Sequence, residues 1–320
     1  MLQTYFKSPI TIIENRIYIN KNNDILEANQ SQTTESFSSK WNHTNNISDL
    51  DRLYNFQYEW FLKLYGFNDE NNLANFLQDK NLIIDTGCGL GYKSYWLSKL
   101  APHATVIGID ISDSINIAAS NYLNIPNLFF LKADISNSHL KENICDFVVC
   151  DQVIMHTENP EKTFLHLSEI TSTNGEFACY FYRKKALPRE LIDDYFRIKT
   201  HNIPDQEMWE LSEQLTILGK TLSELNVTFK APDIPLLNIK GGEYDIQRFI
   251  YWNFLKCFWK NDWGFELSKI TNFDWYSPSN AKRYYKNEII ELINNSNMAI
   301  KTWHEEEACF SGRFYKNNKH

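Results

Sequence analysis

The chain has 320 residues, a length typical of about two domains or of one enlarged domain. Hydrophobic residues make up 43% and charged residues 22%, which is enough apolar material for a packed core and excludes a wholly disordered chain. The formal net charge of -8 disfavours nucleic-acid binding over the whole surface, although a local basic groove is compatible with it. No run approaches about 18 consecutive apolar residues, so we expect no membrane-spanning segment.

The N-terminus and the cysteines both favour the cytoplasm. Residues 1–10 lack the long apolar stretch and the small-residue cleavage site of a secretory signal. The six cysteines form no CxxC pair, which is typical of reduced and mostly buried thiols. They are Cys88, Cys145, Cys150, Cys179, Cys257 and Cys309.

Residues 1–78 combine a hairpin, a polar segment and helices. Residues 9–20 are β-rich around a turn at Glu14, Asn15 and Arg16, which predicts a short hairpin. Residues 21–46 are rich in Ser, Thr and Asn, and they are interpreted either as a linker or as an ordered strap whose aromatic residues pack on the core. Apolar residues then recur at helical spacing over residues 48–77, which predicts two helices.

From residue 79 to residue 183, short apolar strands alternate with amphipathic helices. The predicted strands cover residues 82–84, 105–109, 128–131, 147–150 and 175–181. The predicted helices cover residues 92–100, 114–122 and 161–170. Strands that are apolar throughout and separated by helices indicate a parallel sheet covered on both faces, a doubly wound α/β core.

Residues 184–280 interrupt this alternation with a helical, aromatic-rich cap. Helices are predicted at residues 191–200, 207–225 and 247–260. Ten aromatic residues between Tyr251 and Tyr276 fit two interpretations, a core for the cap itself or an apolar pocket for substrate. Residues 281–320 then supply a helix at 286–294 and an antiparallel pair of strands at 299–303 and 309–315, which complete the core sheet.

A glycine-rich motif lies where the first core strand ends and the first core helix begins. It reads Asp85-Thr86-Gly87-Cys88-Gly89-Leu90-Gly91. Glycines at such a turn let a ligand approach the backbone and the free N–H groups of the helix. A dinucleotide fingerprint requires Gly-x-Gly-x-x-Gly, and Tyr92 stands where its third glycine would be, so the spacing disfavours a nicotinamide-dependent oxidoreductase.

Carboxylates end three consecutive core strands. Asp85 at the first strand can pair with a ligand ammonium, and Asp110 at the second can accept hydrogen bonds from both hydroxyls of a ribose. Asp134 at the third is placed to receive an exocyclic amine. Each acid alone is more often a helix cap or a solvated loop charge, but the three together favour a ligand with an amine, a ribose and an adenine and without a phosphate.

These three motifs, with the segment Asp146 to His156, resemble the S-adenosylmethionine-binding motifs of class I methyltransferases. The resemblance covers roughly residues 79–183, and the segment 273–278 is similar to an aromatic-Pro loop in bacterial members. It implies a mostly parallel, seven-stranded Rossmann-like sheet with an antiparallel last strand, and S-adenosylmethionine as cofactor. By resemblance, Asp85 and the glycine loop hold the methionine moiety, Asp110 the ribose, Ile111 the adenine ring and Asp134 the adenine amine. The cofactor-binding residues so expected are Asp85, Gly87, Cys88, Gly89, Gly91, Asp110, Ile111, Asp134, Ile135, Asp151 and Gln152.

His156 is the candidate general base, since imidazole titrates near neutral pH; alternatively it only begins the next helix. A thiol or amine acceptor needs no base, because positioning and desolvation suffice. The turn at residues 151–154 lacks the Asn-Pro-Pro-Tyr of adenine-N6 DNA enzymes, and no Pro-Cys nucleophile pair occurs, so we expect no DNA acceptor. His139, His156 and His166 show no metal-ligand spacing, so no metal is expected.

The resemblance and the cap together predict methyl transfer to a small-molecule acceptor, a metabolite or a sugar-bearing natural product. Trp41, Tyr251 and Trp252 are the candidates for contact with the acceptor. An RNA or protein methyltransferase and a non-catalytic S-adenosylmethionine-binding or scaffold protein remain as alternatives. The sequence leaves the acceptor, the methylated atom and the oligomeric state open.

Overall fold

The computed structural model describes residues 2–20, 26–47 and 50–316, and the chain folds into two compact units. The first, called the core unit here, comprises Met1–Glu27, Tyr54–Arg183 and Lys282–His320. The second, the helical unit, comprises Ala28–Leu53 and Lys184–Ala281. The helical unit therefore contains the predicted cap together with a segment from the N-terminal region.

Seven strands form the predicted Rossmann-like sheet, in the order β5-β4-β3-β6-β7-β12-β11. The first five are parallel, and β12 is antiparallel to both of its neighbours. Their bounds are β3 Leu82–Thr86, β4 Thr105–Asp110, β5 Leu128–Lys132, β6 Cys145–Cys150, β7 Thr171–Arg183, β11 Met298–Glu305 and β12 Cys309–Lys316. The predicted fold class is confirmed, and parallel strands place the carboxyl ends of β3 to β7 at one edge of the sheet.

Three further strands extend this sheet. The predicted hairpin is present as β1 (Ile10–Ile13) and β2 (Arg16–Ile19), and β2 pairs in parallel with β5. The two-residue strand β10 (Arg283–Tyr284) pairs in parallel with the end of β7. The attachment of the hairpin to β5 is a pairing between distant segments, which the local sequence pattern does not contain.

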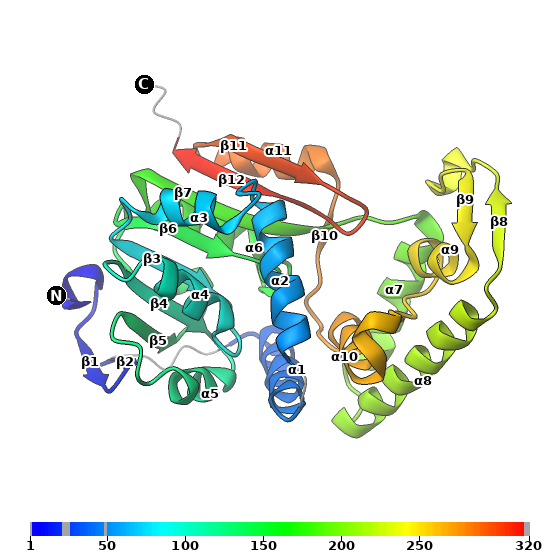
Figure 1. Ribbon diagram of the computed structural model, residues 1–320, viewed down its shortest axis with the longest axis horizontal. Helices are drawn as coiled ribbons and strands as arrows, with labels where there is room; N and C mark the ends of the chain where they lie inside the picture. The colour runs from blue at the N-terminus through cyan, green and yellow to red at the C-terminus, as the bar shows by residue number, and fades with distance from the viewer. Residues whose placement is uncertain (1, 21–25, 48–49, 317–320) are drawn as a thin grey trace. The chain divides into compact units, whose positions relative to one another are not determined.

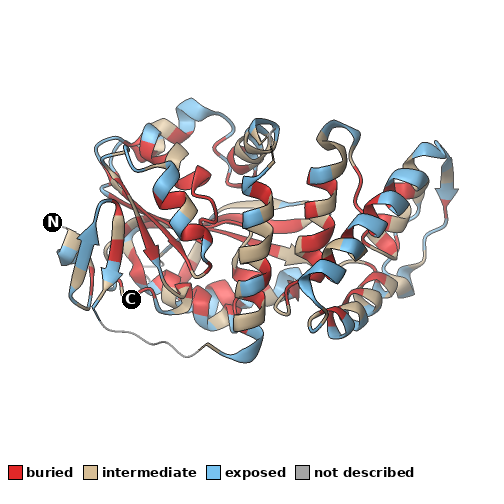
Figure 2. Cartoon of the chain, turned by 90° about the horizontal axis from the view of Figure 1, so that it is seen from below, coloured by how far each residue is buried: buried red, intermediate tan, exposed pale blue. Residues whose placement is uncertain are grey.

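Helices cover both faces of the sheet (Figure 1). One face packs against α2 (Asp51–Leu64), α3 (Glu70–Leu77), α4 (Tyr92–Leu100) and α5 (Ser114–Asn121). The other packs against α6 (Pro160–Ile170) and α11 (Lys286–Asn295). Successive side chains of β3 point to opposite faces of the sheet. Ile83 belongs to the buried apolar cluster on the first face, and Ile84 belongs to the cluster on the other face. Figure 2 shows the resulting pattern, with buried strands between helices whose outer faces are exposed.

The helical unit contains five α-helices among its described residues. They are α1 (Ala28–Asn45), α7 (Leu187–Thr200), α8 (Asp205–Glu224), α9 (Ile246–Asn253) and α10 (Gly264–Tyr276). A small hairpin of β8 (Thr228–Ala231) and β9 (Gly242–Asp245) was not predicted. The aromatic helix predicted to reach residue 260 ends at Asn253, and the segment 273–276, expected in a loop, is the last turn of α10.

The polar segment at residues 21–46 differs from the prediction of a linker or strap. Residues 21–25 lie outside the described part of the chain, whereas residues 28–45 form α1. Polar contacts hold this helix in place: the Gln32 side-chain amide donates to the Ser277 carbonyl at 2.9 Å, and the Thr33 hydroxyl accepts from the Asn280 backbone N–H at 3.0 Å. Because its buried face is polar, the helix lacks the apolar periodicity by which helices are recognised.

All six cysteines are buried, and none of them forms a disulfide bond. Within the described residues, no helix has the length and apolar character needed to cross a bilayer.

Candidate functional site

The glycine-rich loop joins β3 to α4 in a conformation that requires glycine. Gly87, Gly89 and Gly91 all have positive φ, at 69°, 54° and 81°. A Cβ on Gly87 would lie 2.4 Å from the Val153 side chain, in the turn after β6. The Gly87 N–H donates to the Ile109 carbonyl at 2.6 Å, so the loop also packs against the end of β4. The bare backbone of this loop therefore lies at the carboxyl edge of the sheet.

Asp110, at the end of β4, connects this loop to the next one. One of its buried carboxylate oxygens accepts from the Gly89 N–H at 2.8 Å, and the other accepts from the N–H and hydroxyl of Ser112 at 2.8 and 2.6 Å. Burial raises the pKa of Asp110, and the hydrogen bonds from Ser112 and Gly89 oppose that rise. A carboxylate has about four acceptor positions, so Asp110 is fixed in orientation and keeps capacity for a ligand hydroxyl.

Asp85, at the end of β3, is 2% exposed and accepts a hydrogen bond from the Ser94 hydroxyl at 2.6 Å. Burial raises its pKa to about 6, although Lys93 and the bond from Ser94 favour the charged form. A carboxylate buried with so little compensation is suited to a cationic ligand.

Asp151, at the end of β6, belongs to a buried network. Its carboxylate accepts a hydrogen bond from the Tyr65 hydroxyl at 2.7 Å and forms an ion pair with the Lys93 ammonium. Burial lowers the pKa of Lys93, but the charges of Asp151, Tyr92 and Asp85 and the hydrogen bond to Asp151 together outweigh burial, so the pKa is raised. Burial and the Asp151 charge together raise the pKa of Tyr65.

The remaining predicted cofactor residues have unequal surroundings. Asp134 is half-buried and accepts from the Ser136 N–H at 2.8 Å, so it caps the short 3-10 helix Ile135–Asn137. Ile135 is 5% exposed and Cys88 is also buried, and both side chains pack in the apolar core. Ile111 is half-buried.

Gln152 follows Asp151 in a left-handed conformation, with φ 64°. Its amide group donates to the Gln57 side chain at 2.9 Å and to the Asp151 carboxylate at 3.2 Å. These bonds orient the turn that follows β6.

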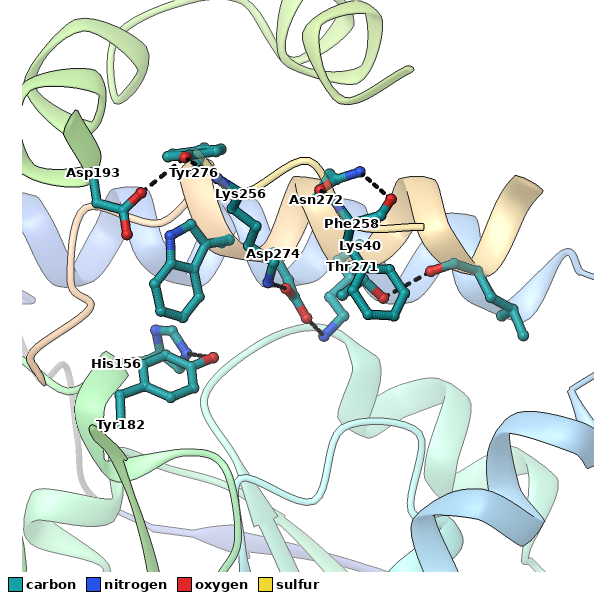
Figure 3. A network of polar contacts seen from close by, with 12 residues as sticks. Lys40, His156, Tyr182, Asp193, Lys256, Phe258, Thr271, Asn272, Asp274 and Tyr276 are labelled. Atoms are coloured by element: carbon teal, nitrogen blue, oxygen red, sulfur yellow. Dashed lines mark hydrogen bonds and ion pairs between the residues drawn. The ribbon is translucent and has the colours of Figure 1, made fainter. Parts of the chain in front are cut away.

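His156 lies in the short 3-10 helix Ile154–His156 and is 6% exposed. Its Nε2 lies 3.4 Å from the hydroxyl of Tyr182 on β7, and the two rings meet edge to face (Figure 3). The helix cap that follows belongs to Asn159, whose side chain accepts from the Lys162 N–H at 2.9 Å. A base role for His156 remains a prediction.

The three predicted acceptor residues belong to the helical unit. Tyr251 on α9 is buried and packs edge to face against the rings of Trp252 and Phe258. Trp252 and Trp41 are half-buried, and the Lys40 ammonium lies 4.5 Å from the centre of the Trp41 ring. At least Tyr251 thus serves the internal packing of its unit.

A buried polar network runs through the same unit (Figure 3). Lys40 on α1 and Lys256 flank the Asp274 carboxylate, at 2.8 and 3.8 Å. Burial lowers the pKa of Lys256 to about 8, opposed by Asp274. Asp193 accepts from the Tyr276 hydroxyl at 2.8 Å and forms a two-pronged ion pair with Arg189.

The structure thus brings Asp85, Asp110, Asp151 and the glycine loop together at one sheet edge. A bare-backbone loop beside two fixed carboxylates fits the methionine and ribose parts of S-adenosylmethionine. Among the described residues, no group of three or more His, Cys, Asp or Glu is arranged to hold a metal ion.

The sequence reasoning missed Lys93, Ser94 and Tyr65. A signal existed for the first two, because Lys93, Ser94, Leu97 and Ser98 recur at helical spacing and form the buried stripe of α4. A lysine on such a stripe is rare unless it is paired.

Comparison with known proteins gives one family. Residues 77–219 match the model of a family described as a methyltransferase domain. The mitochondrial ubiquinone biosynthesis O-methyltransferase of Dictyostelium discoideum is 29% identical over 150 residues, which are 42% of this chain and 46% of the relative. The malonyl-acyl-carrier-protein O-methyltransferase of Bacillus cereus is 28% identical over 93 residues, 29% of this chain and 34% of the relative. The chain thus spans less than half the length of these curated relatives.

Among solved structures, PKMT2 from Rickettsia typhi in complex with AdoHcy matches with a TM-score of 0.50 and 14% identity, over 82% of this chain and 53% of that chain. This likeness shows a shared Rossmann-like α/β fold. The family match indicates that residues 77–219 form a methyltransferase domain, the class that the sequence motifs of this region resemble.

Proposed function

We propose that this protein transfers the methyl group of S-adenosylmethionine to a small-molecule acceptor. The observation that carries the proposal is the glycine loop, with three positive-φ glycines, next to the buried carboxylates of Asp85 and Asp110. When bound, the cofactor supplies a methyl group activated by a sulfonium. The chain's part is to bind, orient and exclude water, because an in-line displacement on an activated methyl depends mainly on positioning.

The acid residues have distinct roles in this proposal. Asp85 attracts the positively charged methionine end, and Asp110 accepts hydrogen bonds from the ribose. Asp134 accepts a hydrogen bond from the adenine amine, and Ile111 packs against the adenine ring. Gln152 steadies the turn after β6.

We infer that oxygen is the first acceptor atom to test, since both curated relatives named above are called O-methyltransferases. A hydroxyl acceptor must lose a proton, and His156 is our candidate to take it. His156→Asn should then lower kcat and remove one limb of its pH profile, whereas Tyr182→Phe should have a smaller effect. A kcat unchanged by His156→Asn would contradict the base role.

The helical unit is our proposed source of acceptor contacts, through Trp41, Tyr251 and Trp252. Trp252→Ala should raise KM for the acceptor and leave the Kd for S-adenosylhomocysteine unchanged. Tyr251→Phe is the gentler variant for the buried ring, since it removes only the hydroxyl. An unchanged acceptor KM in both variants would leave these rings with a packing role.

The test is an acceptor screen with labelled S-adenosylmethionine, in which S-adenosylhomocysteine release is measured by mass spectrometry. Pools of phenols, carboxylic acids, amines and thiols are compared with RNA and with protein extracts. Turnover with a small-molecule pool, lost in Asp110→Ala, supports the proposal. Transfer only to RNA or protein, or binding without turnover in every pool, would overturn it.

A further inference from the structure

The cofactor site contains a buried ammonium group of its own. Lys93 is the second residue of α4, and its side chain is only 11% exposed. Its Nζ pairs with the carboxylate of Asp151 and lies 3.5 Å from the backbone carbonyl oxygen of the same residue. Both contacts place the charge at the carboxyl end of β6, which pairs in parallel with β3.

The ammonium of Lys93 lies among buried carboxylates at this edge of the sheet. Asp85, Asp110 and Asp151 all end strands at this edge, and all three are buried. The sulfonium and α-ammonium of S-adenosylmethionine suit these carboxylates, but its α-carboxylate is repelled by them unless a cation lies near.

Lys93 is a buried cation at this edge. Lys132 is the last residue of β5 at the same edge, but its side chain is 53% exposed and pairs with Asp113. An ammonium has three N–H donors, and the Asp151 contacts use two of those on Lys93.

We propose that Lys93 gives its third N–H to the α-carboxylate of the bound cofactor while it stays paired with Asp151. Lys93 is then a specificity-determining residue, which selects a cofactor with an intact amino-acid end. This inference rests on the proposed cofactor site.

A truncated ligand tests it directly. Decarboxylated S-adenosylmethionine keeps the adenosine, sulfonium and ammonium and lacks only the carboxylate. The parent should bind S-adenosylmethionine roughly 10- to 100-fold more tightly than the decarboxylated ligand, as expected for one charge-assisted hydrogen bond. In Lys93→Met this preference should vanish, through weaker binding of the intact ligand and not through tighter binding of the truncated one.

Two further variants control for folding. Lys93→Met leaves the Asp151 carboxylate buried without its cation, so Lys93→Met/Asp151→Asn removes both charges and should show the same loss of preference. Lys80→Met removes another buried lysine, located before β3 at the opposite end of that strand, and should keep the parent's preference.

The outcomes separate the two levels of the argument. If Lys93→Met weakens the binding of both ligands equally, or leaves the binding of the intact ligand unchanged, the proposed role of Lys93 is overturned and the cofactor site is not. A parent that binds neither ligand would overturn the cofactor site as well.

Discussion

Replacement of Asp110 tests the geometry of the site most sharply. Asp110→Ala removes the carboxylate that we expect to bind the ribose, and charge-assisted hydrogen bonds of this kind contribute about 1–3 kcal/mol to binding. The Kd for S-adenosylhomocysteine should therefore rise roughly 5- to 150-fold, as measured by isothermal titration calorimetry. The same substitution leaves the N–H groups of Gly89 and Ser112 without their acceptor, so the loop also loses its fixed shape.

Asp110→Asn separates these two effects. The amide keeps one oxygen for either backbone N–H and loses the buried charge, so it should preserve the fold better than alanine while it still weakens binding. Asp113→Ala is the matched control, because Asp113 lies three residues further on, is 69% exposed, and forms a surface ion pair with Lys132. Such pairs contribute under about 1 kcal/mol, so this variant should bind like the parent. Parent-like binding by folded Asp110→Ala and Asp110→Asn, with folding checked by circular dichroism, would refute the assigned site.

The remaining predictions concern stability, measured by urea unfolding. Burial raises the pKa of Asp85 to about 6, so the folded state holds its proton more tightly than the unfolded chain; the resulting stabilisation is complete below about pH 4 and is lost as the pH rises through 6. Between about pH 5 and 8, the free energy of unfolding should therefore fall by roughly 1–2 kcal/mol less in Asp85→Asn, which keeps an acceptor for Ser94, than in the parent. The same pH dependence in both proteins would contradict this. Gly91→Ala should cost roughly 2–4 kcal/mol, because φ is positive and the new Cβ would lie 2.9 Å from the Phe130 ring. Gly264→Ala, with positive φ and open space, should cost only about 1–2 kcal/mol, and equal losses would refute the packing argument.

The sequence predicted the core unit well because its signals are local. Strands such as β4 are apolar throughout, as a sheet covered on both faces requires, and the helices between them begin and end where their periodicity does. The glycine loop, Asp85 and Asp110 were predicted to lie together for the same reason, since each is at or just after the end of a strand. Their buried positions at one edge follow from parallel pairing.

What the sequence could not predict depends on partners far along the chain. Helix α1 was missed because its buried face is polar and is satisfied by residues more than 240 positions away, such as Ser277. The pairing of Lys93 with Asp151 could not be predicted because Asp151 lies 58 residues further on. The pairing of β2 with β5 was not predicted for the same reason, because the two strands are far apart in the sequence. In each case the stabilising contact is visible only after the chain has folded.

The central claim is that the edge formed by Asp85, Asp110 and the glycine loop binds S-adenosylmethionine. Calorimetric titration of the full chain with S-adenosylhomocysteine and, separately, with NAD tests it most directly. We expect micromolar-range binding of S-adenosylhomocysteine and no measurable heat with NAD. Tighter binding of NAD, or no binding of S-adenosylhomocysteine by the folded protein, would contradict the account.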